Sequence, residues 1–192
     1  MRITKSSHLT NNDLDPLEIF SFPLDDFQLQ AINSLNNGHS VVVSAPTGSG
    51  KTLVGEYAIY RAISHGQKVF YTTPLKALSN QKLRDFRNQF GNENVGLLTG
   101  DMSLNREASV LVMTTEIFRN MLYAEVNKDD DPLDKVETVV LDECHYMNDS
   151  QRGTVWEESI IHCPSSVQFV ALSATVANAG QLTDWMQEVH GP

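Results

Sequence analysis

The stretch VVVSAPTGSGKT, residues 41–52, constrains the fold more than any other part of this 192-residue sequence. Its first four residues form an apolar, β-branched run that is typical of a buried strand, and a Gly-rich turn and the start of a helix follow at once. Gly48 and Gly50 allow the backbone to curl so that successive N–H groups point inward, where the helix N-terminus adds a favourable dipole. A strand, this turn and a helix in that order predict an α/β domain that binds phosphate groups.

The polar residues of the same turn predict that the ligand is a nucleoside triphosphate with Mg²⁺. Lys51 is placed to reach the β and γ phosphates, and the Thr52 hydroxyl to take a coordination position on Mg²⁺. The strict pattern has Gly where this chain has Ala45, a small departure because Ala can adopt most of what the turn requires. The alternative is a Gly-rich turn beside a surface lysine. The predicted nucleotide-binding loop is Ala45, Pro46, Thr47, Gly48, Ser49, Gly50, Lys51 and Thr52.

Short apolar runs alternate with longer amphipathic segments along the rest of the chain. The runs are continuous and rich in β-branched residues, as in parallel strands that are covered on both faces. This alternation predicts a three-layer, doubly wound α/β fold with a mostly parallel sheet. We expect strands at 39–45, 68–73, 94–99, 109–114, 138–142 and 167–173, helices at 52–65, 76–90, 115–124, 153–162 and 178–189, an opening helix from about Asp25, and an exposed acidic connector at 127–135.

A second motif, VVLDECH at 139–145, supplies the acidic partner that a phosphate-binding loop needs. An apolar strand that ends at Asp142 places a carboxylate at the carboxyl edge of the sheet, where the phosphate loop also lies. Asp142 would hold Mg²⁺ through its water shell. Glu143 would orient or deprotonate the attacking water. The predicted catalytic residues are therefore Lys51, Asp142 and Glu143.

The same motif could instead be a zinc site, because Asp, Glu, Cys and His all bind metals. Four consecutive ligands cannot all converge on one tetrahedral ion from a strand end, and the chain has no C-x-x-C or H-x₃-H partner for them. We therefore expect Cys144 to alternate away from Asp142 and Glu143, as side chains do along an extended strand end. It should then pack as a small apolar residue behind the site.

Composition limits the kind of protein further. At 41% hydrophobic, the chain is long enough for one well-buried domain and short for two. It has no apolar run of membrane-spanning length and no signal-peptide pattern, and Cys144 and Cys163 fit a reducing compartment, so we expect a cytoplasmic protein without a membrane partner. The net charge of −10 argues against a broad basic surface for nucleic acid. A local cluster of basic residues is compatible with nucleic-acid binding but does not by itself indicate it. The cluster comprises Arg61, Lys68, Lys76, Lys82, Arg84 and Arg87.

Taken together, APTGSGKT, DECH and LSAT resemble the motor core of the superfamily 2 DExD/H-box helicases. The resemblance extends from about Phe22 to about Trp185, and it implies a RecA-like lobe that binds ATP and Mg²⁺ and couples ATP hydrolysis to movement on nucleic acid. The segments that carry it are 45–52, 142–145 and 172–175, with three further motifs at 72–82, 97–101 and 113–122.

Two longer segments, 22–32 and 142–161, are similar to the antiviral, exosome-assisting (superkiller-type) DExH RNA helicases. This similarity implies that adenine stacks near Phe22 and that the Gln28 amide, which can donate and accept together, recognises it. Ordinary core packing is the alternative for Phe22, and it is the expected role of Phe27.

The resemblance also implies residues that contact nucleic acid, expected to be single-stranded RNA, and residues that couple this contact to the nucleotide. Strand ends and helix N-termini at the carboxyl edge offer N–H groups and hydroxyls to successive phosphates without reading bases. Helix capping by Thr114 and Thr115 is compatible with that role. For His145, a structural hydrogen bond is the alternative. The predicted contacts are Pro74, Leu75, Lys76, Thr114, Thr115 and Glu116, and the predicted coupling residues are His145, Ser173, Ala174 and Thr175.

For the domain organisation, we expect an N-terminal extension at 1–21 and the first RecA-like lobe at 22–192. Helicases of this kind have a second lobe whose arginine fingers contribute on the order of 10³ to 10⁵ in rate. No segment after LSAT resembles that motif, so we expect the second lobe to be absent from this chain and the isolated lobe to be weakly active or inactive. Further expected partners are RNA-degradation or RNA-processing factors.

Three other classes stay open at this point. One is another phosphate-loop ATPase or a GTPase, for which an N-K-x-D motif that reads the base would be expected. Another is a nucleotide-gated module that binds RNA or a protein partner without productive turnover. The third is a DNA-directed helicase or translocase of the same superfamily.

Overall fold

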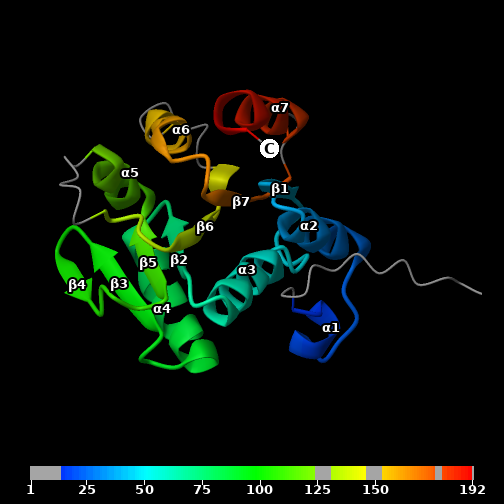
Figure 1. The fold of residues 1–192 in the computed structure, drawn as a ribbon, viewed down its shortest axis with the longest axis horizontal. Helices are drawn as coiled ribbons and strands as arrows, with labels where there is room; N and C mark the ends of the chain where they lie inside the picture. Colours follow the sequence, from blue (N-terminus) through cyan, green and yellow to red (C-terminus); the bar gives the residue numbers. More distant parts are fainter. Residues whose placement is uncertain (1–13, 124–130, 146–152, 176–178, 192) are drawn as a thin grey trace, which may run out of the picture.

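The computed structural model describes residues 14–123, 131–145, 153–175 and 179–191, and in these ranges it shows a seven-stranded sheet with helices on both faces (Figure 1). No helix in these ranges is long and apolar enough to cross a membrane. The helices are α1 (Pro16–Ile19), α2 (Asp26–Asn36), α3 (Thr52–Ser64), α4 (Lys76–Phe90), α5 (Thr115–Tyr123), α6 (Gly153–His162) and α7 (Ala179–His190). The strands are β1 (Val41–Ser44), β2 (Lys68–Thr73), β3 (Val95–Thr99), β4 (Met102–Leu104), β5 (Val110–Thr114), β6 (Val136–Leu141) and β7 (Gln168–Ser173).

The strand order is β1-β7-β6-β2-β5-β3-β4, and every neighbouring pair is parallel except β3 with β4. Strands that run parallel and follow each other in the chain need crossover connections, and α3 and α4 provide them between β1 and β2 and between β2 and β3. β4 instead returns directly beside β3. Gly96 permits this close return, because a Cβ at that position would lie 2.1 Å from the carbonyl oxygen of Asn105. The parallel strands therefore have their carboxyl ends at one edge of the sheet.

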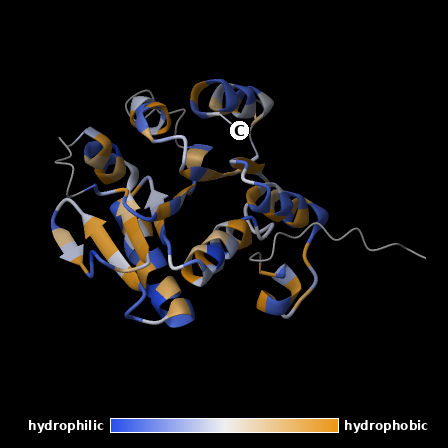
Figure 2. Cartoon of the chain, viewed as in Figure 1, coloured by the Kyte–Doolittle hydropathy of each residue, from blue (hydrophilic) through white to orange (hydrophobic). Residues whose placement is uncertain are grey.

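The alternation of side chains along each strand builds the three layers. In β2, Val69 and Tyr71 pack in the cluster with α2, α3 and α4, whereas Phe70 packs in the cluster with α5, α6 and α7. The strands are accordingly apolar and lie between helices with one apolar and one polar side (Figure 2). Gly55 brings α3 close to the sheet, since a Cβ there would be only 3.3 Å from the Tyr71 ring. Burial of each large apolar side chain in these layers contributes roughly 1.5–3 kcal/mol.

The predicted three-layer, doubly wound and mostly parallel fold is confirmed. All six predicted strands appear with ends within two residues of the expected ones. α1 and β4 were not predicted. α1 is only four residues long, and the three residues of β4 are all exposed. Neither element therefore produces a periodic pattern of apolar residues in the sequence. Of the predicted acidic connector, residues 131–135 precede β6, and 127–130 lie outside the described residues.

The segment before residue 22 contributes to the core. Phe20, which is 7% exposed, clusters with Leu53 and Tyr57 of α3. The Tyr57 hydroxyl also donates to the carbonyl oxygen of Leu14 at 3.0 Å. The described part of the expected N-terminal extension thus packs against the domain, while residues 1–13 lie outside the described ranges.

Candidate nucleotide and nucleic-acid site

The residues predicted to act on nucleotide and nucleic acid lie along the carboxyl edge of the sheet. The phosphate loop follows β1, and Asp142 follows β6. β7 lies between these strands, pairing Ser44 with Ser173 on one side and Leu141 with Ala171 on the other. Because neighbouring strands are about 4.8 Å apart, the two motifs are separated by roughly 10 Å across the edge. A triphosphate with a metal ion can bridge such a span.

The phosphate loop has the backbone that its glycines allow. Gly48 and Gly50 have φ angles of 83° and 80°, in the left-handed region that favours glycine. α3 begins directly after the loop, at Thr52. Lys51 is only 5% exposed. Within the described ranges the Ser49 hydroxyl is buried without a partner, so the loop offers a donor that suits an anion.

Gln28 connects the start of α2 to the phosphate loop. Its Oε1 accepts from the backbone N–H of Asp25 at 2.8 Å, and its Nε2 donates to the carbonyl oxygen of Gly50 at 2.9 Å. A side chain on Gly50 would collide with this amide, because a Cβ there would lie 2.8 Å from Nε2. Gln28 therefore lies beside the loop, with both ends of its amide bonded.

The two phenylalanines of this segment differ in their surroundings. Phe22 is 51% exposed, with its ring 5.9 Å from that of Phe20, so core packing does not account for it. Phe27 packs against the core cluster of α2, α3 and α4, as expected. Such an exposed ring is available for stacking on a base.

Asp142 is a buried carboxylate with several donors around it. It is 6% exposed, and its backbone N–H donates to the carbonyl oxygen of Thr72 at 2.9 Å. The Tyr71 hydroxyl donates to Oδ2 at 2.7 Å, and the N–H of Glu143 donates to Oδ1 at 2.9 Å. The Lys82 ammonium lies 3.5 Å from Oδ2. Burial beside this carboxylate raises the pKa of Tyr71 well above its ordinary value, so the phenol stays protonated and donates.

The expectation of an extended chain through Cys144 is wrong, because β6 ends at Leu141 and a turn follows. Glu143 has a φ of 52°, unusual for a residue with a side chain. The expected position of Cys144 is nevertheless confirmed: it is 3% exposed and packs in the cluster with α5, α6 and α7. Burial raises the pKa of Cys144 to about 12, so the thiol is protonated at neutral pH.

His145 connects the end of β6 to the end of β7. Its Nδ1 lies 3.2 Å from the backbone nitrogen of Ala174 and 3.2 Å from Oε2 of Glu143. Nδ1 can accept from Ala174 only without a proton and can donate to Glu143 only with one, so the two contacts belong to different tautomers of the ring. Ser173 is buried and its hydroxyl donates to the carbonyl oxygen of Ala174 at 2.8 Å, whereas Thr175 is exposed.

The predicted nucleic-acid contacts form a second group on the same edge. β2 and β5 are neighbours, and the Thr115 hydroxyl donates to the carbonyl oxygen of Thr73 at 3.3 Å. The N-termini of α4 and α5, which begin at Lys76 and Thr115, therefore follow neighbouring strands. This arrangement brings together Pro74, Leu75, Thr114 and the exposed Glu116 with the two helix starts.

Three residues that contact these groups were not predicted: Tyr71, Lys82 and Asp101. Lys76 forms an exposed ion pair with Asp101, and hydrogen bonding to this lysine holds the pKa of Asp101 below its ordinary value. Asp101 belongs to the LLTGD motif and Lys82 to the basic cluster, but the sequence predicted no role for either residue. Their contacts depend on which strands are neighbours, which the sequence alone does not show.

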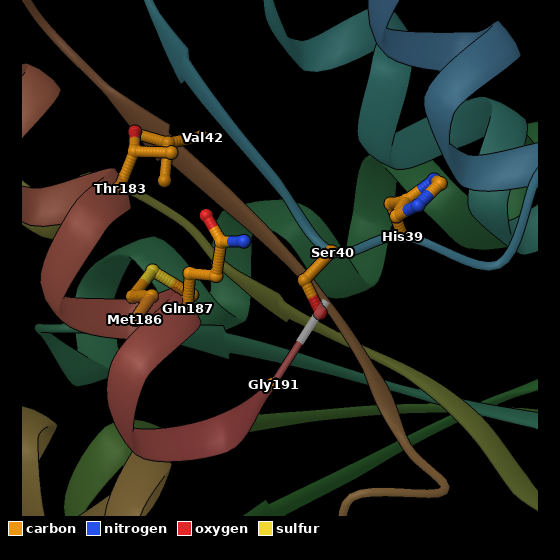
Figure 3. A pocket seen from close by; sticks show the side chains of 7 residues that line it. All are labelled: His39, Ser40, Val42, Thr183, Met186, Gln187 and Gly191. Carbon is orange, nitrogen blue, oxygen red and sulfur yellow. The ribbon is translucent and has the colours of Figure 1, made fainter.

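A small pocket of about 180 Å³ lies at the opposite edge, between the start of β1 and α7 (Figure 3). Ser40 and Val42 line it from one side, and Met186 and Gln187 from the other. Because Ser40 precedes β1 and the phosphate loop follows β1, this pocket is separate from the predicted site.

The residues present fit a nucleoside triphosphate with Mg²⁺. The buried Ser49 hydroxyl and the Lys51 ammonium are donors that suit phosphate oxygens. Thr52 and Asp142 offer oxygen ligands, which hard cations prefer. The described residues contain no group of three or more His, Cys, Asp and Glu side chains that could hold a metal ion. Mg²⁺ needs no such group, since it keeps several waters and takes other ligands from phosphates.

The fold and this edge define a RecA-like, phosphate-loop domain, and comparison with known proteins gives its family. The profile of the DEAD/DEAH box helicases matches residues 25–182, and this chain belongs to that family. It is 54% identical over 182 residues to the Arabidopsis thaliana DExH-box ATP-dependent RNA helicase DExH15, covering 93% of this chain and 16% of the relative.

Further relatives support the predicted subgroup. The chain is 49% identical to the antiviral helicase SKI2 of Saccharomyces cerevisiae, covering 90% of this chain and 13% of that protein. It is also 49% identical to the exosome RNA helicase MTR4 of Mus musculus, covering 89% of this chain and 16% of the relative. The predicted resemblance to superkiller-type DExH helicases is confirmed. The chain spans about a sixth of the length of these relatives.

A solved structure supports the fold. The Mycobacterium smegmatis helicase Lhr bound to ssDNA and AMP-PNP is similar with a TM-score of 0.66 and 28% identity, covering 85% of this chain and 26% of the Lhr chain. The family match also decides the GTPase alternative. The letters NKDD at 127–130 do satisfy the N-K-x-D pattern, but they lie outside the described residues, and the chain belongs to the helicase family.

Proposed function

We propose that this chain is the ATP-binding lobe of an ATP-dependent RNA helicase, which couples hydrolysis of Mg-ATP to translocation on, or unwinding of, single-stranded RNA. The observation that carries the proposal is the arrangement along one sheet edge. The phosphate loop, the Asp142–Glu143 pair and the paired starts of α4 and α5 all lie there. Family membership makes this reading more specific than the phosphate loop alone.

Each residue has a definite task in the proposed nucleotide site. The N–H groups of the loop and Lys51 would bind the phosphates, and Thr52 and Asp142 would hold Mg²⁺. Bound Mg²⁺ would neutralise charge that develops on the phosphates. Glu143 would orient the attacking water and accept its proton.

Adenine recognition would involve Phe22 and Gln28. The exposed Phe22 ring would stack on the base. Gln28 would have to exchange its bond to Asp25 or to Gly50 for one to adenine, because both ends of its amide are occupied. The present contacts of Gln28 therefore link base recognition to the shape of the phosphate loop.

Titration of a fluorescent ATP analogue into Lys51→Ala tests the nucleotide site. We expect measurable Mg-ATP binding to disappear, because charge-assisted hydrogen bonds are worth roughly 1.5–3 kcal/mol each. Arg84→Ala is the matched control, since it removes one positive charge from an exposed position on α4. Unchanged affinity in a folded Lys51→Ala protein would refute the assignment of the loop.

The nucleic-acid half of the proposal rests on the helix starts at Lys76 and Thr115. Their N–H groups suit successive phosphates and need few lysines, so a chain with a net charge of −10 can still bind RNA locally. The Asp101 carboxylate would have to release Lys76. Thr114 and Glu116, with Pro74 and Leu75, would complete this surface.

Binding of one oligonucleotide sequence as RNA and as DNA tests the strand type. We expect the RNA strand to bind more tightly than the DNA strand. Lys76→Ala should weaken RNA binding and reduce its salt slope by about 1. Arg106→Ala, on the far edge of the sheet, is the control and should leave RNA binding unchanged. Tighter DNA binding would favour the DNA-directed alternative. The similarity to Lhr bound to ssDNA is compatible with that alternative. Full nucleotide and RNA binding without turnover in a two-lobed protein would favour the binding-module alternative.

The remaining expectations belong to the same proposal. We assign 22–192 to the first RecA-like lobe, acting with a second lobe in the full-length protein, while recognising that residues 14–21 pack with it. RNA-degradation or RNA-processing factors are proposed partners, by analogy with the exosome helicase MTR4. A cytoplasmic location stays a prediction from the sequence.

A further inference from the structure

The Asp142 carboxylate already has a cation beside it, and that cation comes from α4. The Lys82 ammonium lies 3.5 Å from Oδ2, the same oxygen that accepts from the Tyr71 hydroxyl. We propose that Lys82 is a positioning residue that holds Asp142 in the nucleotide-free lobe and competes with Mg²⁺ for its carboxylate, so that Mg²⁺ enters with the nucleotide and not alone. This inference rests on the proposed function, in which Asp142 holds Mg²⁺.

Lys82 is held in this position on several sides. Its side chain is only 19% exposed, and its ammonium lies 5.3 Å from the centre of the Tyr71 ring and 5.6 Å from that of Phe86. Cation–π contacts strengthen when the cation is partly removed from water, so both rings stabilise the ammonium group in this position. The partner carboxylate is 5% exposed. This pair therefore differs from exposed ion pairs, which contribute little.

The geometry gives this contact a consequence for metal binding. A carboxylate buried without a partner is costly, and Lys82 offsets that cost while no metal is present. A Mg²⁺ ion held at Asp142 would be repelled by the Lys82 ammonium beside the carboxylate, since like charges weaken binding. The phosphates of ATP bring enough negative charge to outweigh this repulsion. Lys82 thus makes the carboxylate selective for Mg²⁺ that arrives with a triphosphate.

The position of Lys82 on α4 adds a connection between the two halves of the edge. The same helix begins at Lys76, which is among the predicted nucleic-acid contacts. A change in the Lys82–Asp142 contact when Mg-ATP binds would therefore act on the helix that carries a proposed strand-binding end.

Titration of Mn²⁺ into the nucleotide-free lobe, with the free ion followed by its EPR signal, tests the proposal without relying on activity. We expect Lys82→Met to bind Mn²⁺ at least about fivefold more tightly than the parent, the factor that corresponds to two unit charges a few ångströms apart in water. The Mg²⁺ concentration for half-maximal ATP-analogue binding should fall in the same direction. Lys82→Arg, which keeps the charge, should stay close to the parent.

Two controls identify the carboxylate and the charge. Adding Asp142→Ala to Lys82→Met should remove the gain in Mn²⁺ affinity, and Arg84→Met, on the same helix but exposed, should leave it at the parent value. If Lys82→Met does not fold, Lys82→Gln replaces it under the same criteria. Unchanged or weaker Mn²⁺ binding in the folded variant, or an equal gain in Lys82→Arg, overturns the role of Lys82. Loss of Mg-ATP binding in the parent itself would instead refute the proposed function.

Discussion

The two edges of the sheet use buried polar groups in different ways. At the amino edge, Arg61 in the last turn of α3 is 6% exposed and has partners on all sides. Its guanidinium donates to Glu137 through Nε at 2.6 Å, to the carbonyl oxygen of Leu35 at 2.7 Å and to Gln168. At the carboxyl edge, the Ser49 hydroxyl is buried without a partner among the described residues, and Lys51 is 5% exposed.

This contrast separates polar groups that stabilise the fold from polar groups prepared for a ligand. A buried group without a partner costs free energy, and among the described residues such groups occur outside the phosphate loop too, as Thr138 Oγ1 in β6 and His190 Nδ1 at the amino edge. Ser49 differs from these two because it lies in a Gly-rich loop at the start of a helix, a setting that favours an anion. The satisfied network at the amino edge joins α2, α3, β6 and β7 and leaves little capacity for a ligand. Function is therefore expected at one edge and stability at the other.

The largest expected effect tests the amino edge. Arg61→Met should destabilise the fold by about 3–5 kcal/mol, because it leaves Glu137 and other buried acceptors without their donor. Urea unfolding measures this loss. Lys68→Met is the matched control at the same edge: its pair with Glu107, at 3.1 Å, involves a glutamate that is 90% exposed and should contribute under about 1 kcal/mol. Equal losses in the two variants would remove the distinction between the edges.

The next effect concerns chemistry at the carboxyl edge. In a protein with both lobes, Glu143→Gln should retain ATP affinity, because the amide keeps the shape of the side chain. Hydrolysis should fall by at least about 10², since the amide cannot accept the proton of the attacking water. Steady-state turnover and nucleotide titration measure the two quantities separately. Parent-like turnover would make Glu143 structural.

The third effect compares neighbours within the motif. Asp142→Ala should weaken Mg²⁺-dependent nucleotide binding about tenfold or more, because it removes the charge that faces the ion. Cys144→Ala should keep binding within a few-fold of the parent, since its thiol packs in the core on the other side. Titration of a fluorescent ATP analogue, with and without Mg²⁺, distinguishes the two. Stoichiometric zinc in the purified protein that is lost with Cys144→Ala would contradict the helicase reading of DECH.

The sequence predicted the carboxyl edge in more detail than the amino edge, for a physical reason. A phosphate loop is a local structure, so the spacing of Gly48, Gly50 and Lys51 determines it within eight residues. Contacts such as Lys82 with Asp142, or Arg61 with Glu137, join residues more than fifty positions apart. They depend on strand order and register, which periodicity does not reveal.

The turn at Glu143 was missed for a different reason. Positive φ angles are rare for residues with a side chain, so an extended continuation of β6 was the reasonable prediction. The turn is a local strain of the kind that collects at functional sites, where surrounding contacts maintain it. Here the bond from the Glu143 N–H to Oδ1 of Asp142 is one such contact.

The smallest expected effect is a pH dependence at the amino edge. His190 at the end of α7 is 8% exposed, and its ring lies 4.8 Å from that of Phe169. Burial lowers the pKa of His190, partly opposed by the hydrogen bond between Nε2 and the carbonyl oxygen of Pro164. Between the lowered pKa and the unfolded value near 6.5, the unfolded chain therefore binds more protons than the folded one. Stability that is present above about pH 6.5 is lost as the pH falls through this window.

Thermal melts of the parent and of His190→Gln between about pH 7.5 and 5.5 measure this contribution. The variant should lose less stability on acidification than the parent, because its side chain does not titrate. His162→Gln is the control, since His162 is exposed at the end of α6. The stacked pair of Trp156 and Trp185 gives a fluorescence signal for folding in all three proteins. Nucleotide binding should be the same in the parent and in His190→Gln, because His190 lies at the edge away from the phosphate loop. Parallel pH profiles of stability for these two proteins would show that acid sensitivity arises elsewhere.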